Sequence, residues 1–479
     1  MKLPRNKTKI VCTIGPASDS PSVMEQMIKA GMNVARINFA HGDFASHQKM
    51  IENLRAAAGV AGRRLAILAD LPGPKIRIGQ LGKEPIELKP GDAFTLTTEE
   101  IVGDANRVSV NFGGLPKAVK MGDTLFLNDG FIQLEAEKVE GKDVNCRVLV
   151  GGELRSHKGL NLPGIDLGIS AFTDRDYQCL KFALEQGVDA VSQSFVVSGA
   201  DIAAVRTAAV NLGYSPFIIA KIERSRALDQ IESILDAADG IMIARGDLGV
   251  EIPIEQIAVV QKQLMRQANV LGKPVITATQ MLESMTTNRR PTRAEATDVA
   301  NAILDGTDCV MLSEESAMGK YPVDAVIMLA KIAGAIEPHR PPYHVRETLK
   351  AIGHEQKVRL GDLIALSVEA TLERIAPAAL FVPTRSGAIA RSIARFRPSV
   401  WITAVSLQEP TCQRLQFSYG VFPVHEQDYP EDWKAYAKSW MLAHEKEGNL
   451  VVLTEGPSPK HPEANHRMEI IDLGNQWKK

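Results

Sequence analysis

Two apolar runs in the middle of the chain each end in charged side chains. Residues 217–220 lead into Lys221 and Glu223, and a second run, residues 240–244, leads to Asp247. Apolar residues at roughly helical spacing lie between the runs, so the segment is typical of strand, helix and parallel strand. In a barrel of such units the strands end at one mouth. One lysine, two carboxylates and one arginine, Arg245, would then converge there, which would suit a metal-bound anionic substrate.

The first part of the chain repeats the same strand-and-helix step three times. Strands are expected at residues 8–14, 33–37 and 65–69. Arg36 belongs to the second of these strands, Asn38 follows it directly, and Asp70 follows the third. Because parallel strands of a barrel end on the same side, we expect these three side chains at the carboxyl side of the sheet.

The pattern changes between residues 72 and 167. A Pro-Gly-Pro break is followed by short strand-like stretches separated by Gly-Asp, Asn-Asp-Gly and Gly-Lys turns, which is typical of a small all-β unit. The unit is inserted into the strand-and-helix pattern directly after the third expected strand. An insert at this position lies over the mouth of a barrel, so we predict a lid.

Strand and helix alternate again from residue 168 to residue 338. Helices are expected at 173–186, 199–212, 254–271, 294–304 and 323–336. Further strands are expected at 188–192, 274–278 and 309–312. With the two central runs and the first three strands this makes eight, so residues 1–71 and 168–338 are predicted to form a (β/α)8 TIM barrel.

A proline-rich stretch at residues 337–342 is typical of a linker. Beyond it, residues 345–479 are predicted to form a smaller α/β domain. Strands of this domain are expected at 379–382, 401–405 and 450–453. The first of them leads into a loop and a helix, an arrangement that suits a phosphate cradle but also occurs in ordinary turns. The loop residues are Thr384, Arg385, Ser386 and Gly387.

The composition of the 479 residues is that of a globular protein with more than one domain. Hydrophobic residues make up 45% of the chain and the formal net charge is -2, so the balance indicates neither a nucleic-acid nor a membrane partner. The five cysteines are scattered without a CxxC pair, which disfavours disulfides and a zinc site. With neither a signal peptide nor an apolar run of membrane-spanning length, we expect a cytoplasmic protein.

Nine motifs of this chain resemble those of pyruvate kinases. They are TKIVCTIGPAS, GMNVARINFAHG, GPKIRIG, KGLNLPG, AKIE, DGIMIARGDLGVE, TATQMLESM, RPTRAEATDVANAILDGTDC and MLSEESA. The resemblance implies transfer of a phosphoryl group from phosphoenolpyruvate to ADP, which yields pyruvate and ATP in the final step of glycolysis. It also implies a homotetramer whose C-terminal regulatory domain makes the enzyme allosteric.

The resemblance assigns roles to the residues at the barrel mouth. Glu223 and Asp247 are implied to bind Mg²⁺ or Mn²⁺. The implied catalytic residues are Lys221, Arg36 and Thr279, and Thr279 or nearby waters could relay the proton to the enolate. Substrate binding is implied for Arg36, Lys221, Gly246, Asp247 and Thr279, phosphate binding also for Arg77, and nucleotide binding for Asn38, His41, Arg77 and Lys158. Without the resemblance, the carboxylates could be surface charges and Lys221 part of a structural salt bridge.

Two positions depart from the pattern of relatives that require K⁺. Those pyruvate kinases hold K⁺ with an Asn, a Ser, an Asp and a carbonyl group, and they carry a Glu before the lid. Here Asn38 and Asp70 remain, but Ala40 stands at the serine position and Lys75 at the glutamate position. An ammonium group repels K⁺ while supplying its charge, so the resemblance to the K⁺-independent class predicts that Lys75 replaces the cation. The alternative is a solvated lysine beside bound K⁺.

The loop at residues 384–387 resembles the sugar-phosphate effector loop of the family. Ile389 stands where its last hydroxyl is expected, and residues 456–465 lack the glycine-rich pattern of a fructose-bisphosphate clamp. A sugar phosphate or a nucleotide is therefore expected as effector, and fructose 1,6-bisphosphate is not the first choice.

Two other functions remain open on the sequence alone. A metal-dependent lyase or aldolase of the same barrel type would share Glu223 and Asp247, but it would not need a lid that carries Arg77 and Lys158. A catalytically silent, metabolite-sensing protein would not need Lys221. Pyruvate formation that depends on ADP distinguishes the three.

Overall fold

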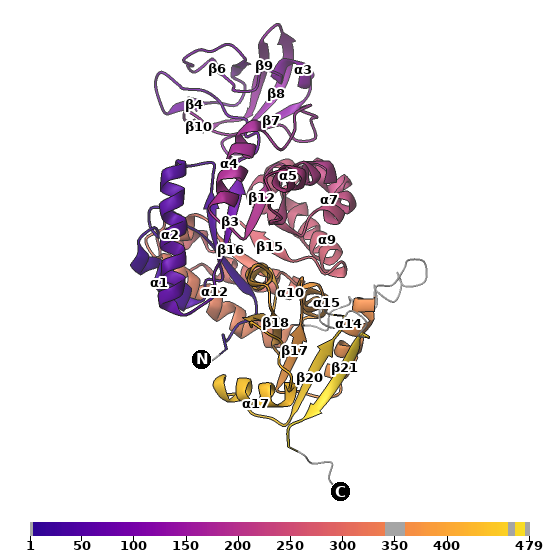
Figure 1. The fold of residues 1–479 in the computed structure, drawn as a ribbon. Coiled ribbons are helices and arrows are strands. Elements are labelled where there is room, and N and C mark those ends of the chain that lie inside the picture. Colours follow the sequence, from indigo (N-terminus) through magenta and orange to yellow (C-terminus); the bar gives the residue numbers. More distant parts are fainter. Residues whose placement is uncertain (1–2, 341–359, 458–464, 475–479) are drawn as a thin grey trace.

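The structure, a computed structural model, describes residues 3–340, 360–457 and 465–474. Its centre is a closed barrel of eight parallel strands (Figure 1). They are β1 (Lys9–Thr13), β2 (Val34–Asn38), β3 (Ala66–Leu71), β12 (Ala190–Gln193), β13 (Phe217–Ile222), β14 (Gly240–Ala244), β15 (Val275–Ala278) and β16 (Cys309–Leu312). Pairing of β1 with both β2 and β16 closes the ring. The predicted TIM barrel is confirmed.

The strands of the barrel are buried on both faces. Every residue of β1, β3, β13 and β14 is buried, because helices cover the outer face and the barrel interior covers the other. Such strands show no in-out alternation, which explains why they appear in the sequence as continuous apolar runs. The charged exceptions at their carboxyl ends, Asp70 and Lys221, mark one mouth of the barrel.

Helices follow the barrel strands. They are α1 (Pro21–Ala30), α2 (Phe44–Ala61), α4 (Asp174–Glu185), α5 (Gly199–Asn211), α6 (Ser225–Asp229), α7 (Ile231–Ala237), α8 (Arg245–Glu251), α9 (Ile257–Val270), α10 (Arg293–Asp305), α11 (Glu314–Ala317) and α12 (Pro322–Ile336). Ser20, Thr173 and Thr292 cap three of them through side-chain oxygens. Two expectations were too simple. The helix between the central runs is divided at Gln230, whose φ of -112° interrupts the helical conformation, and residues 254–271 begin with a 3₁₀ turn.

The lid lies between β3 and α4. Its strands are β4 (Ile86–Leu88), β5 (Ala93–Thr97), β6 (Arg107–Ser109), β7 (Thr124–Leu127), β8 (Ile132–Glu140), β9 (Asp143–Val150), β10 (Gly152–Leu154) and β11 (Leu160–Asn161). Six of them form a sheet in the order β11-β7-β8-β9-β5-β6, with an apolar core of its own. One short helix, α3 (Leu115–Ala118), departs from the all-β expectation. The lid lies at the carboxyl end of the barrel strands (Figure 1).

The C-terminal unit is a five-stranded sheet with helices, in the order β19-β18-β17-β20-β21. Its elements are α14 (Leu360–Leu372), β17 (Ala379–Pro383), α15 (Ala388–Ala394), β18 (Ile402–Ser406), α16 (Glu409–Arg414), β19 (Val421–His425), α17 (Trp433–Ala443), β20 (Leu450–Glu455) and β21 (Arg467–Asp472). Of these strands, β19 and β21 were not predicted. β21 is an antiparallel edge strand in which only Ile471 is buried, and β19 contains Pro423, so neither forms an apolar run.

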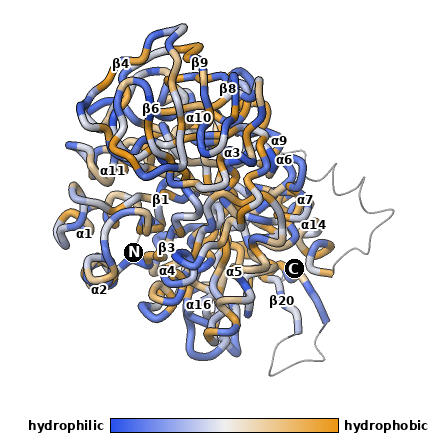
Figure 2. The backbone as a smooth tube through the Cα atoms, turned by 90° about the horizontal axis from the view of Figure 1, so that it is seen from above, coloured by the Kyte–Doolittle hydropathy of each residue, from blue (hydrophilic) through white to orange (hydrophobic). Residues whose placement is uncertain are grey.

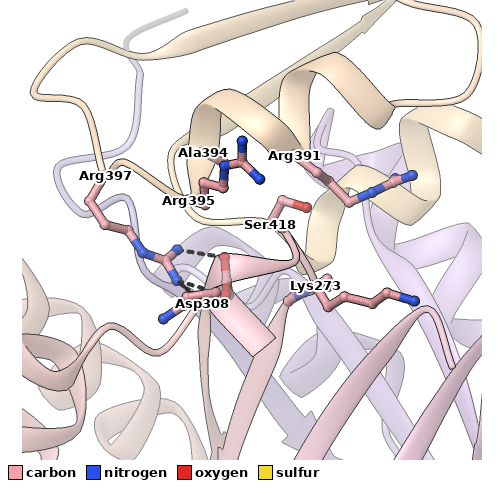
Figure 3. Close-up of a pocket in the computed structure, with 10 residues that line it drawn as sticks. Lys273, Asp308, Arg391, Ala394, Arg395, Arg397 and Ser418 are labelled. Atoms are coloured by element: carbon pink, nitrogen blue, oxygen red, sulfur yellow. Dashed lines mark hydrogen bonds and ion pairs between the residues drawn. The ribbon is translucent and has the colours of Figure 1, made fainter. Parts of the chain in front are cut away.

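The C-terminal unit meets the barrel at the end opposite the lid (Figure 1). Arg397 Nη1 lies 2.6 Å from Asp308 Oδ1, and Nη2 lies 2.9 Å from Oδ2 (Figure 3). Asp308 directly precedes β16, at the amino end of the strand. The ion pair therefore fastens the C-terminal unit to the side of the barrel that is remote from the lid.

The first residues of the predicted linker are packed against the barrel. The Glu337 carboxylate accepts hydrogen bonds from the backbone amides of Lys7 at 2.9 Å and Thr8 at 2.7 Å, and Glu337–His339 form the 3₁₀ turn η3. These bonds fix the chain at its exit from α12, so this part is not a free linker. The last two residues of the expected linker, the start of the expected C-terminal domain and most of the segment 456–465 lie outside the described residues.

Hydrophobic stretches are short and interleaved with hydrophilic ones along the chain (Figure 2). Among the described residues no helix is long and apolar enough to cross a membrane. The five cysteines are buried free thiols. Two further 3₁₀ turns, η2 (Glu283–Thr286) and η4 (Leu415–Phe417), complete the list of elements with η1 (Ile254–Gln256).

Candidate active site

Lys221 lies at the centre of the charged barrel mouth. Its Nζ is 2.8 Å from Glu223 Oε1 and 3.3 Å from Asp70 Oδ2, and it donates a 2.8 Å hydrogen bond to Ser194 Oγ. Burial alone would lower the pKa of Lys221, but the Asp70 and Glu223 carboxylates outweigh it and raise the pKa above its ordinary value. The side chain is therefore a fixed, buried positive charge.

Arg36 and Asp70 form a second ion pair in the same mouth. Arg36 Nε donates to Asp70 Oδ2 at 2.9 Å, and its Nη1 donates to Thr13 Oγ1 at 2.8 Å. Ser192 Oγ donates to the other Asp70 oxygen at 2.6 Å. Although burial opposes it, Lys221 and Arg36 hold the pKa of Asp70 below its ordinary value. Asp70 thus keeps two cations side by side, where they can face an anion together.

The two predicted metal ligands lie close enough to influence each other. Glu223 Oε2 accepts a 2.7 Å hydrogen bond from the Phe195 amide. Burial raises the pKa of Glu223, Lys221 counteracts this, and the negative charge of Asp247 adds to the rise. A divalent cation would relieve this repulsion, and carboxylate oxygens are the ligands that Mg²⁺ prefers. The pair fits such an ion.

The described ranges contain no group of three or more His, Cys, Asp or Glu side chains placed to hold a metal ion. A cation at Glu223 and Asp247 would therefore complete its coordination with water or substrate oxygens. Mg²⁺ commonly binds in this way, with one or two carboxylates and several exchangeable ligands.

Gly246 and Thr279 meet between β14 and β15. The Gly246 amide donates a 2.7 Å hydrogen bond to Thr279 Oγ1, whose own proton goes to the Ala278 carbonyl at 2.7 Å. A Cβ on Gly246 would lie 3.4 Å from Thr279 Oγ1, an ordinary van der Waals contact, so the two residues are close neighbours. The backbone amide and the hydroxyl are thus bonded to each other next to Asp247 in the chain.

The predicted nucleotide residues come from the barrel and from the lid. Asn38 Oδ1 accepts from the Ala40 amide at 3.1 Å, and Arg77 Nη1 donates to the His157 carbonyl at 3.1 Å. Lys158 lies next in the lid chain. Partial burial lowers the pKa of His41, and Arg77, Lys75 and Arg36 lower it further. His41 therefore lies within electrostatic range of the cations of the mouth.

Lys75 lies at this junction between lid and barrel. Its Nζ is 3.8 Å from Asp247 Oδ1. The oxygens of the expected cation site have other partners, since Asp70 accepts from Arg36 and Ser192 and Asn38 accepts from Ala40. The lysine charge is thus directed at a predicted metal ligand.

The loop at residues 384–387 lies in the C-terminal unit and is not brought to the barrel mouth. Thr384 Oγ1 accepts from the Gly387 amide at 3.0 Å, and Gly387 has a positive φ of 79°. Thr411 Oγ1 donates to the Arg385 carbonyl at 2.7 Å. The loop and Ile389 line a cavity of about 1070 Å³. Its wall carries both positively and negatively charged side chains, including Arg467 and Glu455.

Several polar residues of the mouth were not nominated from the sequence. They are Ser192, Ser194 and Asp298, together with the backbone amide of Phe195, whereas Arg245 was expected at the mouth but without its partner Asp298. Ser192 and Ser194 stand two apart at the end of β12, so the alternation of a strand places them on one side. This alternation was a signal in the sequence that could have identified the two serines. The contact between Arg245 on α8 and Asp298 on α10 is a tertiary contact and has no sequence signature.

Comparisons with known proteins give the same family for both the barrel and the C-terminal part of the chain. The family model described as "Pyruvate kinase, barrel domain" matches residues 5–326, and that described as "Pyruvate kinase, alpha/beta domain" matches residues 362–471. The chain is 49% identical over 478 residues to a pyruvate kinase of Thermococcus litoralis, covering 99% of this chain and 100% of the relative. It is 42% identical over 462 residues to pyruvate kinase 2 of Synechocystis sp., covering 95% and 77%. A pyruvate kinase of Geobacillus stearothermophilus is also 42% identical, with 94% and 78% covered.

Proposed function

This chain belongs to the pyruvate kinase family, and on that premise we propose that it transfers the phosphoryl group of phosphoenolpyruvate to ADP. The products are pyruvate and ATP, and the reaction is the last step of glycolysis. The observation that carries the proposal is the buried contact of Lys221 with both Asp70 and Glu223. It holds an ammonium group beside a guanidinium group and a carboxylate pair at the barrel mouth.

Lys221 and Arg36 act on the phosphoryl group in this proposal. Negative charge spreads over its oxygens during transfer, so preorganised cations stabilise the transition state more than the ground state. Asp70 contacts both side chains and orients them without solvent reorganisation. Their burial strengthens the interaction, because water is excluded.

Glu223 and Asp247 hold a divalent cation, Mg²⁺ or Mn²⁺. Bound there, the ion supplies charge neutralisation and polarisation of substrate oxygens. The protein contributes the ligand geometry, since the Phe195 amide fixes one Glu223 oxygen and Lys221 fixes the other. Removal of divalent ions with a chelator is expected to abolish turnover.

The substrate carboxylate binds at the start of α8. The Gly246 amide and the Thr279 hydroxyl, which are hydrogen-bonded to each other in the structure, would exchange this bond for the carboxylate and bind it together with the Asp247 amide. Thr279, directly or through water, also passes the proton to the enolate carbon after phosphoryl transfer. ADP lies between barrel and lid, in contact with Asn38 and His41 below and with Arg77 and Lys158 above.

The decisive experiment measures pyruvate formation by the purified protein from phosphoenolpyruvate and ADP with Mg²⁺. Turnover that requires both substrates and the metal supports the proposal. Pyruvate formed without ADP would favour a lyase or aldolase instead. Tight metabolite binding without turnover would favour a sensing protein.

We further propose that Lys75 replaces a monovalent cation, so that the enzyme does not need K⁺. Support comes from the ammonium group 3.8 Å from Asp247 and from its effect on the pKa of His41. The charge thus lies where metal, phosphate and nucleotide meet. Electrostatic attraction at this range is appreciable in a partly buried site.

Activity of the wild type is expected to stay within about twofold when K⁺ is replaced by tetramethylammonium at constant ionic strength. Lys75→Glu should lose most activity without K⁺ and recover part of it when K⁺ is added. Lys83→Glu, the same charge change at an exposed lid position, serves as control and should remain indifferent to K⁺. Strong activation of the wild type by K⁺ would contradict the proposal.

A phosphorylated metabolite is proposed to regulate the enzyme from the cavity beside Arg385 and Ser386. The loop amides and the arginine favour an anion, while the nearby acidic residues limit its charge. A panel of sugar phosphates and nucleotides should contain at least one compound that shifts the phosphoenolpyruvate concentration at half-maximal rate. Arg385→Ala should remove that shift without changing the rate at saturation.

The assembly is proposed to be a homotetramer in the cytoplasm. The tetramer is proposed from the family, and the cytoplasm from the reduced state of the five cysteines. A native mass of four times the chain mass would support it. A stable monomer would oppose it.

A further inference from the structure

The backbone at the end of β15 has an unusual conformation. Thr279 and Gln280 have φ values of 66° and 54°, so two consecutive residues with side chains occupy the left-handed region. A β-branched residue such as threonine is strongly disfavoured there. The conformation persists only if its surroundings hold it in place.

The guanidinium group of Arg245 provides such a hold. Its Nη2 donates to the Thr279 carbonyl at 2.8 Å, and its Nε donates to the Ala278 carbonyl at 3.3 Å. The same Nη2 lies 2.9 Å from Met281 Sδ. One planar group therefore binds both peptide oxygens that flank the strained residue. The side chain of Arg245 itself is only 12% exposed.

Asp298 on α10 fixes the orientation of this guanidinium group. Its Oδ1 is 2.7 Å from Arg245 Nη1, and its Oδ2 is 2.7 Å from Nη2. With this ion pair in place, Nη2 and Nε are directed at the carbonyl groups of Thr279 and Ala278. Lysine cannot reproduce the arrangement, because its donors radiate from one nitrogen atom.

We propose that Arg245 is a positioning residue that sets the catalytic geometry of Thr279. Its guanidinium group holds the turn at 278–280, which in turn places the Thr279 hydroxyl within 2.7 Å of the Gly246 amide. Arg245 itself does not touch the substrate. The inference rests on the proposed function, because it assigns a consequence to the position of Thr279 in the reaction.

The first test compares Arg245→Met and Arg245→Lys with the wild type. Displacement of a substrate-binding group by a fraction of an ångström to about 1 Å lowers kcat by up to about 10²-fold, so we expect a loss of about that size in Arg245→Met. Arg245→Lys should recover only a small part. Asp298→Asn keeps one side-chain oxygen but loses the negative charge, and its kcat should lie between those of Arg245→Met and Arg245→Lys.

Arg206→Met is the matched control. Arg206 Nη2 also binds a backbone carbonyl, that of Ala237 at 2.9 Å, and a carboxylate, that of Asp239 at 3.0 Å. This contact lies at the amino end of the barrel strands, away from the site. Its loss should lower the melting temperature without a comparable loss of kcat. Equal kcat losses in Arg206→Met and Arg245→Met would overturn the inference.

A double-mutant cycle separates positioning from general destabilisation. If Arg245 acts through Thr279, Arg245→Met should reduce kcat by less than about threefold in a Thr279→Val background, although it acts strongly alone. Multiplicative effects of the two substitutions would refute the inference. An inactive wild type would refute the proposed function instead, so the two failures are distinguishable.

Discussion

At the scale of single residues, the site depends on charges that are held apart from water. Lys221 is 8% exposed and contacts two carboxylates, yet a third partner, Ser194, also accepts from it. Each contact fixes the ammonium group in one place. The cost of burying one charge is thus offset by the two carboxylates and the hydroxyl group around it.

Lys221→Met is expected to lower kcat by about 10²–10³-fold, because a preorganised charge on the transferring group is lost. The KM for phosphoenolpyruvate should change much less, since Arg36 still attracts the phosphate. Steady-state kinetics with a circular dichroism check on folding measure both. Lys29→Met, an exposed lysine on α1, is the control. A large rise in KM at constant kcat would assign Lys221 to ground-state binding.

The sequence predicted this cluster because its members stand at strand ends. Lys221, Glu223 and Asp247 follow two apolar runs, and the barrel architecture brings such positions together. Arg245 shows the limit of that reasoning. It also follows a strand, but its side chain turns toward Asp298 on α10, and this tertiary contact has no signal in the sequence.

At the scale of elements, two arginines connect the lid to the segment after β13, which carries the proposed metal ligand Glu223. Arg224 follows Glu223, and its Nη2 donates to the Ile165 carbonyl at 3.2 Å in the chain that returns from the lid. Its Nε lies 3.4 Å from Glu251 Oε2 on α8. Arg226 Nη1 lies 2.7 Å from Asp166 Oδ1. The return segment is thereby attached to two elements of the site.

Arg224→Ala should increase hydrogen exchange in residues 163–168, where the Ile165 amide is bonded to Leu162. The substitution also leaves the buried Glu251 without its arginine, which destabilises the segment. Arg226→Ala removes a largely exposed pair and should have little effect. Exchange mass spectrometry compares the two. Equal protection in Arg224→Ala and the wild type would show that the arginine does not hold the lid.

Regular elements were predictable in proportion to their burial. The eight barrel strands are apolar runs and were all expected, whereas the edge strand β21 exposes most of its side chains and has no comparable signal. The division between α6 and α7 at Gln230 was also invisible. It arises from local backbone geometry rather than from a proline or a glycine.

At the scale of the whole molecule, lid and C-terminal unit occupy opposite ends of the barrel (Figure 1). The contact with the C-terminal unit includes buried charges on both sides, among them Arg397 with Asp308 (Figure 3). Within one chain, any influence of the proposed effector cavity on catalysis would therefore pass through the barrel. The strand β16 is one direct route, since Asp308 precedes it and Ser313 follows it.

Lys9 also lies at this contact between the barrel and the C-terminal unit, and its ammonium group is buried there. It lies in β1, is 4% exposed, and donates from Nζ to the Val421 carbonyl of β19 at 2.6 Å. The ammonium group also lies 5.3 Å from the centroid of the Trp401 ring. Burial lowers the pKa of Lys9 to about 8, although Cys309, Glu337 and Asp308 oppose the shift. The folded protein thus binds this proton more weakly than the unfolded chain does.

The free energy of unfolding should therefore contain a contribution from Lys9 that rises with pH. Below pH 8 the lysine is protonated in both states and the full penalty applies; between pH 8 and 10.5 the folded state loses the proton first, and the penalty disappears. The complete span corresponds to about 3 kcal/mol, of which about 2 kcal/mol should develop between pH 7 and about pH 9.5. Denaturant unfolding of the wild type and of Lys9→Met across this pH range measures the contribution. It appears as a change with pH in the difference between their free energies of unfolding. Lys29→Met should show no such change, and a pH-independent difference for Lys9→Met would mean that Lys9 keeps its proton at the contact between barrel and C-terminal unit.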